Sequence, residues 1–269
     1  MRITVFALDN RAGPLQPSPQ PVKSVHAEDG GFTLVEMLVV LAIIALLAGL
    51  LLPALAKGKE EARCVKCLSN LRQVNVGFRV FMLDHNGQAP WHLETNEGGT
   101  YGVLSKDVWR NYQAAASELD TPKILVCPSD RATFNHVLDW STTPRGLAYS
   151  TNRGKAISYV IGLDAYEELP ATVLSGDRHL LGGASNLCKN PYTKGVPAWE
   201  FGKNPTNSSW ANTIHDKQGQ LALVDGSVQR TRTAALREIM LTAYKVLTNG
   251  TIRTLSGSRP DNHVQPPRF

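Results

Sequence analysis

The longest apolar run of the chain lies near its N-terminal end, and it is long enough to cross a membrane as a helix. From Met37 to Ala56 there are 20 residues without a charge. At about 1.5 Å per helical residue this run spans about 30 Å, which is the thickness of a bilayer core. One carboxylate, that of Glu36, comes directly before the run. Because a charged group in hydrocarbon is costly unless it is paired, this position indicates that Glu36 has a partner.

After this run the apolar positions take the spacing of a helix with one buried face. Steps of three and four residues separate Cys64, Cys67, Leu71, Val74, Phe78 and Phe81, which places them on one side of a helix. Asn86-Gly87 is a typical helix stop. The two patterns predict one helix from about Thr33 to Asp84, about 78 Å long at the same rise and kinked at Pro53.

Beyond Gly87, short apolar segments alternate with turn residues. Strand composition occurs at residues 124–126, 157–161, 171–174 and 220–224. The last segment is followed by Asp225-Gly226, which predicts a hairpin with a tight turn. The stretch from Leu236 to Leu247 has the spacing of a short amphipathic helix. We therefore expect an α+β fold, in which the second half of the long N-terminal helix packs on a small antiparallel β-sheet.

Composition supports one folded domain after the helix. The chain of 269 residues is 42% hydrophobic and 19% charged, which is typical of a globular protein. Residues 1–31 combine a proline-rich stretch with no apolar period, and the stretch after Arg253 shows no pattern either. We expect both ends to be without fixed structure.

The segment Gly31-Phe32-Thr33-Leu34-Val35-Glu36 resembles the processing motif of type IV prepilins and type II secretion pseudopilins. In that family a glycine precedes the cut, a phenylalanine follows it, and a glutamate is the fifth residue of the mature chain. Pro53 matches the helix-kinking proline common in these proteins. The resemblance implies that the prepilin peptidase cuts after Gly31 and methylates the new Phe32 amine. It also implies that Glu36 meets the N-terminal amine of a neighbouring subunit during assembly.

The same resemblance implies a structural role as a subunit of a pilus or of a type II secretion pseudopilus, and no enzymatic activity. The implied partners are copies of the chain, other pilins or pseudopilins, an inner-membrane assembly platform, and membrane lipid before assembly. The chain would cross the bacterial inner membrane once, with its C-terminal domain in the periplasm or outside the cell, and would enter a filament. The expected parts are a removed leader (1–31), a transmembrane or filament-core helix (32–56), its continuation (57–87), a globular domain (88–252) and a flexible tail (253–269).

Two alternatives to this role stay open. Ala54-Leu55-Ala56 suits a signal peptidase, so the chain could be an exported binding or enzymatic domain, although signal sequences have shorter apolar runs without an acidic residue. A surface minor pilin with an adhesive or DNA-binding role is the second alternative. From Arg230 to Phe269 there are seven basic and two acidic residues. Nucleic-acid binding is nevertheless disfavoured, because no aromatic residues interleave with these charges in a known motif.

A further resemblance covers the globular domain. It rests on Cys67-Leu68-Ser69-Asn70-Leu71-Arg72-Gln73, Asn86-Gly87-Gln88-Ala89-Pro90, Cys127-Pro128-Ser129-Asp130, and His215 followed after nine residues by Asp225-Gly226. These segments resemble a subgroup of pilin-like proteins that carry a His-x9-Asp-Gly segment.

The four cysteines indicate disulfide bonding if the domain is exported. Cys64 and Cys67 lie on one helix face, so each would reach a loop more readily than the other cysteine. We expect Cys67 to pair with Cys127, which leaves Cys64 free or paired with Cys188. A four-cysteine zinc site is the rival interpretation, although only one Cys-x2-Cys knuckle is present.

His215 and Asp225 could belong to a binding site or only to a turn. The simplest interpretation is that Asp225-Gly226 forms the hairpin turn and His215 makes a hydrogen bond in the loop before it. We expect no cofactor. The open alternative is calcium bound by loop carboxylates, for which Asp164, Asp177, Asp216 and Asp225 are available. A hydrolase would need a nucleophile in a context such as Gly-x-Ser-x-Gly, and the sequence has none.

Overall fold

The computed structural model describes residues 31–101, 107–131, 137–187, 197–201, 205–249 and 263–267. The chain divides into two compact units, residues Met1–Leu51 and Leu52–Phe269. The leader expected at 1–31 lies outside the described residues except for Gly31. The first unit is described from there on, and it consists of the beginning of helix α1 (Leu34–Asp84).

Helix α1 confirms the long helix predicted from the apolar pattern, with Pro53 inside it. Its C-terminal end is closed by the main chain. The N–H of Gly87 donates to the carbonyl of Met82 at 2.7 Å, and both Asn86 and Gly87 have left-handed backbone, with φ of 52° and 77°. This is the Schellman arrangement that Asn-Gly favours at a helix end.

The second unit contains a seven-stranded antiparallel sheet in the order β4-β5-β9-β1-β2-β7-β8. Its strands are β1 (Tyr159–Gly162), β2 (Val173–Asp177), β4 (Ala184–Leu187), β5 (Pro197–Glu200), β7 (Gln218–Leu223), β8 (Val228–Arg232) and β9 (His263–Gln265). Two short strands, β3 (Leu180–Leu181) and β6 (Ser209–Trp210), form a separate pair. Within the described residues, the other α-helices are α2 (Val108–Ala114), α3 (Ala116–Leu119) and α4 (Thr233–Asn249), and short 3₁₀ helices lie between the elements. The α+β fold with a helix on an antiparallel sheet is as predicted.

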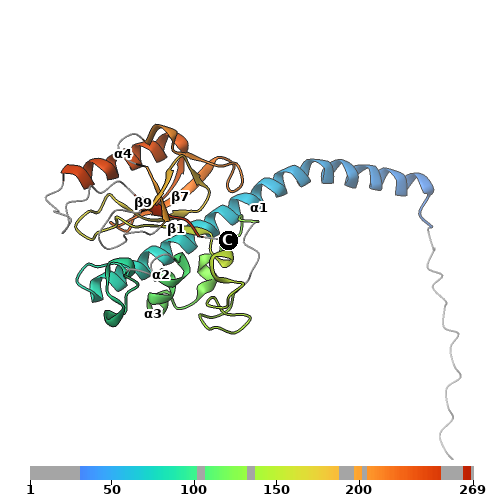
Figure 1. Cartoon of the computed structure of the whole chain (residues 1–269). Helices are drawn as coiled ribbons and strands as arrows, with labels where there is room; N and C mark the ends of the chain where they lie inside the picture. The colour runs from blue at the N-terminus through green and yellow to red at the C-terminus, as the bar shows by residue number, and fades with distance from the viewer. Residues whose placement is uncertain are drawn as a thin grey trace, which may run out of the picture. The chain divides into compact units, whose positions relative to one another are not determined.

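The sheet of this unit has a hydrophobic core on each face. Along β1, Tyr159 and Ile161 belong to one core and Val160 to the other, because neighbouring residues of a strand point to opposite faces. The first core contains the buried side of α1 together with α2 and α3, and the second contains α4. Figure 1 shows this arrangement, with α4 and the second half of α1 on opposite sides of the sheet.

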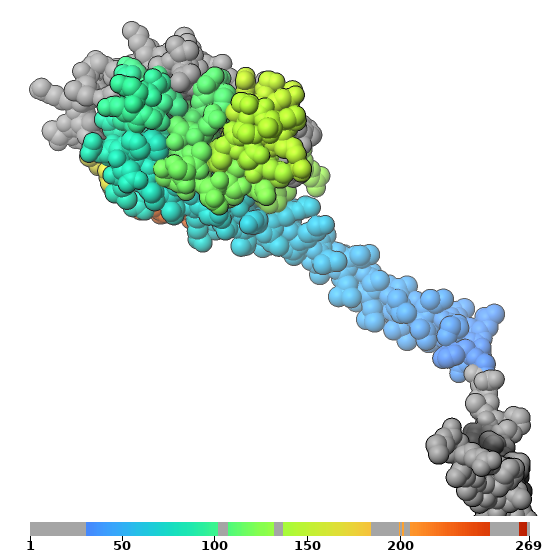
Figure 2. Space-filling view, turned by 90° about the horizontal axis from the view of Figure 1, so that it is seen from below, coloured from blue at the N-terminus to red at the C-terminus, as the bar shows by residue number. Residues whose placement is uncertain are grey.

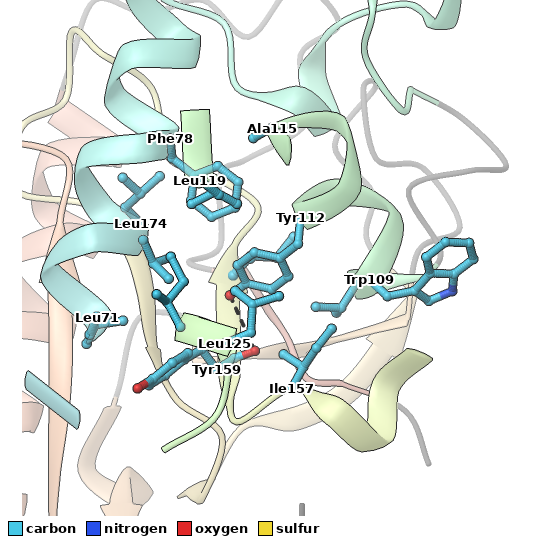
Figure 3. Packing of buried hydrophobic residues seen from close by; sticks show 14 of the residues in the cluster. Leu71, Phe78, Trp109, Tyr112, Ala115, Leu119, Leu125, Ile157, Tyr159 and Leu174 are labelled. Carbon is cyan, nitrogen blue, oxygen red and sulfur yellow. Dashed lines mark hydrogen bonds between the residues drawn. The ribbon is translucent and has the colours of Figure 1, made fainter. Parts of the chain in front are cut away.

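The larger core is built around the aromatic side chain of Phe78, which comes from α1 and has no exposed area. Its ring lies 5.4 Å from that of Trp91 and 5.2 Å from that of Tyr112. The Tyr159 hydroxyl donates to the main-chain oxygen of Cys67 at 3.3 Å. Figure 3 shows Phe78, Tyr112 and Tyr159 in this cluster. The segment between α1 and β1 forms the surface of the domain on this side (Figure 2).

Two local predictions were wrong. Residues 124–126, expected as a strand, lie mostly in the 3₁₀ helix Pro122–Leu125. Pro122 at its first turn and the Thr121 hydroxyl, which accepts from the N–H of Lys123 at 3.4 Å, favour this helix start. The expected flexible tail is also wrong at residues 263–265, because β9 pairs there with both β5 and β1.

Candidate functional site

The first candidate site is the segment at the N-terminal end of α1. Thr33 and Glu36 form a reciprocal cap: the N–H and hydroxyl of Thr33 both donate to Oε2 of Glu36 at 2.8 Å, and the N–H of Glu36 donates to the Thr33 hydroxyl at 3.2 Å. This is a capping box, which satisfies free N–H groups at a helix start. The Thr-x-x-Glu spacing signals it, but the sequence reasoning treated Glu36 only as a charge in need of an external partner.

The cap leaves one oxygen of Glu36 available. Among the residues that the structure describes, the hydrogen bonds of this carboxylate all end on Oε2. Oε1 can therefore accept from a second group without breaking the cap. Glu36 is thus organised by its own chain and still has an acceptor for a partner.

The helix that follows presents apolar side chains on every side. Large hydrophobic residues from Leu34 to Leu55 are exposed by 43% or more. The helix is long and apolar enough to cross a membrane. Apolar surface of this extent requires lipid or other apolar helices around it.

The second candidate site is a buried cluster of sulfur, imidazole and carboxylate groups in the second unit. Cys67 of α1 and Cys127, which follows the 3₁₀ helix Pro122–Leu125, are joined in a disulfide, and their Cα atoms are 4.9 Å apart. Both cysteines are fully buried. This is the pairing expected from the sequence, and it ties the helix to a loop 60 residues further along the chain.

The imidazole of His215 lies against this disulfide. Its Nε2 is 3.3 Å from Sγ of Cys127 and 3.8 Å from Oδ2 of Asp177 at the end of β2. The side chains of His215 and Asp177 are both fully buried. Burial lowers the pKa of His215 and raises that of Asp177 to about 8. Both groups are therefore neutral near pH 7, and their approach is not a formal ion pair.

Gln220 of β7 links Cys64 to this cluster. Its side-chain Nε2 donates to the carbonyl of Cys64 at 2.9 Å and lies 3.4 Å from Sγ of Cys64. Its main-chain N–H donates to Oδ2 of Asp177 at 2.8 Å. Cys64 is buried, and this burial raises the pKa of its thiol. Cys64 has no disulfide within the described residues, and Cys188 lies outside them.

The His-x9-Asp-Gly segment turns out to be one strand and its two turns. His215 precedes β7, whereas Asp225 and Gly226 form the turn between β7 and β8. At about 3.3 Å per residue, the six residues of β7 separate its ends by about 17 Å. His215 and Asp225 therefore do not share a site. The N–H of Ser227 donates to Oδ1 of Asp225 at 2.7 Å, and Gly226 has a φ of 95°, which a turn of this kind requires.

The calcium alternative gains no support from the described part of the chain. Within it, the one group of three side chains placed to hold a metal ion consists of Cys67, Cys127 and His215. Asp225 is at the hairpin turn and Asp177 is in the buried cluster. Among the described residues, the four carboxylates available for calcium are thus not gathered into one group of ligands.

A pocket of about 660 Å³ lies beside His179 and was not predicted from the sequence. Its lining includes Asp130 and Arg178, which form a buried ion pair through Nη2 of Arg178 and Oδ1 of Asp130 at 2.7 Å. Most of the lining is apolar, with Leu181, Trp199 and Ile214 among its residues. These residues come from separate parts of the chain, so no local sequence pattern marks the pocket.

Comparison with known proteins supports the N-terminal segment as the functional one. Residues 28–52 match the family model described as the prokaryotic N-terminal methylation motif. The chain is 30% identical over 69 residues to the ComG operon protein 3 homolog of Bacillus licheniformis. The aligned segment covers 26% of this chain and 71% of that protein. It is 40% identical over 60 residues to the competence protein ComGC of Bacillus subtilis, covering 22% of this chain and 61% of that one. No solved structure matches the chain.

Proposed function

Because the chain belongs to the family of pilin-like proteins with a prepilin-type N-terminal methylation motif, we propose that it is a structural subunit of a filament. In this role the prepilin peptidase cuts between Gly31 and Phe32 and methylates the new amine. The processed chain rests in the membrane through α1 and then joins other subunits through the same helix.

The observation that supports this proposal most directly is the hydrogen bonding of the Glu36 carboxylate. Its carboxylate is capped through Oε2 by Thr33, and Oε1 makes no hydrogen bond with any described residue. Cleavage after Gly31 would keep this cap, because Thr33 follows the new N-terminal residue. An ammonium of a neighbouring Phe32 supplies the donor and the opposite charge that Oε1 lacks. A carboxylate and an ammonium in an apolar medium cost less together than apart.

The apolar surface of α1 explains how one helix can serve both states. In the membrane its exposed side chains contact lipid. In a filament core the same side chains pack against helices of other subunits. Moving from one state to the other keeps apolar surface away from water. The transfer therefore does not require the helix to refold.

The names of the relatives favour one kind of filament. The Bacillus subtilis relative is a competence protein by name, and the Bacillus licheniformis relative is a ComG operon protein homolog; we take this to favour a type IV pilus-like filament over a type II secretion pseudopilus. The partners in this proposal are the peptidase, copies of the chain or other pilins, and a membrane platform for assembly. The globular domain then lies on the outer side of the inner membrane. The relatives are pilin-like proteins, which supports a structural rather than an enzymatic role.

Processing gives the first test. Expressed with a prepilin peptidase, the chain should yield a product whose intact mass and N-terminal sequence begin at methylated Phe32. Gly31→Val should leave the precursor uncut, because a bulky side chain precedes the bond to be cleaved. Gly30→Val, the matched control one residue earlier, should still be processed. A product that begins after Ala56 would refute the proposal and support an ordinary signal peptide.

Assembly gives the second test. Glu36→Ala should remain inserted and be cleaved, but should be at least tenfold depleted in sheared filament fractions. Thr33→Val removes the side-chain part of the cap while it keeps the carboxylate, so this variant should still assemble. Glu60→Ala is a control for loss of a glutamate elsewhere on α1. Normal filament yield from Glu36→Ala would show that the pairing argument is wrong.

A further inference from the structure

The group formed by Cys67, Cys127 and His215 has the composition of a metal site as well as that of a disulfide with a neighbour. We propose that, when the two cysteines are in the dithiol form, they bind a zinc ion together with His215. Metal and disulfide would then be alternative links at the same point between α1 and the loop that contains Cys127.

The donor atoms already converge. Sγ of Cys67, Sγ of Cys127 and a ring nitrogen of His215 all lie within 4.8 Å of one another, and the three residues are buried. In a tetrahedral zinc site, with bonds of about 2.3 Å to sulfur and about 2.0 Å to nitrogen, the nitrogen and sulfur ligands are about 3.6 Å apart. Nε2 of His215 lies 3.3 Å from Sγ of Cys127. The nitrogen therefore needs to move by only a few tenths of an ångström.

Asp177 is the candidate for the fourth ligand, and its side chain would have to move toward the sulfur atoms, because it is not among the three residues whose donor atoms lie within 4.8 Å of one another. Its Oδ2 is 3.8 Å from Nε2 of His215, and the corresponding edge of a tetrahedral site is about 3.3 Å. Oδ1 of Asp177 is buried and has no hydrogen-bond partner among the described residues. Buried polar atoms are seldom left without a partner, so this oxygen is an acceptor available to a metal ion. The N–H of Gln220 holds the carboxylate from outside, as a supporting contact does in zinc sites.

The loop backbone fixes the imidazole in place. His215, Asp216 and Lys217 have φ values of 54°, 49° and 59°. Three consecutive residues with side chains in the left-handed region are strained, and such a conformation persists only where its surroundings impose it. Here it turns the His215 side chain inward, against Cys127. The loop thus places the donor nitrogen beside Cys127.

A thiol reductant supplies the two electrons and two protons that convert the disulfide form into the dithiol form that binds zinc. Two molecules of a thiol, RSH, break the Cys67–Cys127 bond and become RSSR, and each cysteine receives one hydrogen. Zn²⁺ then displaces the two thiol protons and the proton of the Asp177 carboxyl into solvent, and it forms two zinc–sulfur bonds, one bond to the neutral imidazole of His215 and one to the Asp177 carboxylate. The sulfur atoms must separate to about 3.8 Å for tetrahedral coordination, which requires side-chain rotation of the two cysteines.

Cys64 provides a control that separates zinc binding at this site from zinc binding by any buried thiol. It lies one helical turn before Cys67, but its Sγ is 3.4 Å from Nε2 of Gln220, and it is not among the three converging residues. Cys64→Ser should therefore leave the site intact. It is the matched control for each cysteine variant.

The test uses the full chain in detergent micelles. The protein is reduced with a phosphine under anaerobic conditions, incubated with Zn²⁺, freed of unbound metal, and analysed for zinc by mass spectrometry. We expect about one zinc per chain and protection of two thiols from alkylation. Affinity should fall at least tenfold in Cys127→Ser, His215→Ala and Asp177→Asn, and it should be unchanged in Cys64→Ser.

Cobalt provides a second readout that a loss of folding would not imitate. Co²⁺ in the reduced wild-type chain should give the intense visible bands of tetrahedral coordination and a thiolate charge-transfer band. In His215→Ala these bands should weaken or shift, while the oxidised form of that variant should still contain the disulfide by peptide mapping. Absence of bound zinc in the reduced wild-type chain would overturn the proposal. Equal zinc affinity in wild type and His215→Ala would overturn it as well.

Discussion

Reduction of the Cys67–Cys127 disulfide should destabilise the globular unit by an amount that the chain length sets. The bond closes a loop with a sequence separation of 60. In the chain-entropy model, a loop of this size contributes about 4 kcal/mol at 25 °C. For a domain of about 150 to 250 residues, 1 kcal/mol shifts the melting temperature by about 2 to 4 °C. The unit from Leu52 to Phe269 should therefore melt about 8 to 16 °C lower after reduction.

The measurement is a thermal melt followed by near-ultraviolet circular dichroism, on the full chain in micelles, with and without a phosphine reductant. EDTA is present throughout, so that no metal can replace the disulfide. The double variant Cys67→Ala, Cys127→Ala should melt close to the reduced wild type and should not respond to the reductant. Cys64→Ala should respond as the wild type does. If alkylation shows two newly reactive thiols while the melting temperature moves by less than about 2 °C, the loop-entropy argument is refuted.

Two further predictions concern the core of the same unit. His92 is fully buried with Nε2 at 2.7 Å from the carbonyl of Leu163, and burial lowers its pKa from 6.5 to about 4. The contribution of His92 to stability should be constant above pH 6.5 and fall by up to about 3 kcal/mol between pH 6.5 and pH 4, because the unfolded state takes up the proton first. Urea unfolding at pH 7 and pH 4.5 measures the change in the free energy of unfolding between these two pH values. His92→Gln should lose less stability than the wild type over this range. An equal loss in the variant and the wild type would assign the effect to other groups. Phe78→Ala should lower the free energy of unfolding by about 3 to 5 kcal/mol in a urea titration, because its ring packs on Trp91 and Tyr112. Val76→Ala, which changes a side chain exposed by 59%, should alter the free energy of unfolding by no more than about 0.5 kcal/mol. Similar losses in the two variants would contradict the assignment of the buried and exposed faces of α1.

The parts of the fold that the sequence predicted are those specified by residues close together in the chain. The buried side of α1 follows from steps of three and four, and all six residues named for it are buried. The β7–β8 hairpin follows from Asp225-Gly226 between two strand-like segments. In both cases the spacing of side chains and the turn chemistry act within a few residues.

The parts that could not be predicted depend on pairing between distant segments. Strand β9 has only three residues, and it becomes a strand because β5 and β1 offer hydrogen bonds on both its edges. The neighbours of His215 have the same origin: Asp177 comes from β2 and Cys127 from the loop before β1. The sequence marked His215 and Cys127 through the resemblance, but it gave no sign of Asp177 beside them. Thr33 is a different case, since its capping signal is local and was present in the sequence.

The contacts of α1 with the sheet also give a structural role to the polar residues on the buried face of this helix. The Asn70 amide donates to the carbonyl of Val126 at 3.0 Å, and the Asn75 amide donates to that of Leu223 at 2.9 Å. Gln220 reaches in the opposite direction, from the sheet to the carbonyl of Cys64. Apolar contacts alone would tolerate a shift of the helix by one turn. Such a shift would leave these buried amides and carbonyls without partners, which costs about 1 to 3 kcal/mol for each group. Together with the disulfide they fix the position of α1 along the sheet, so a load applied along the helix would be passed to the domain instead of sliding the helix out of it.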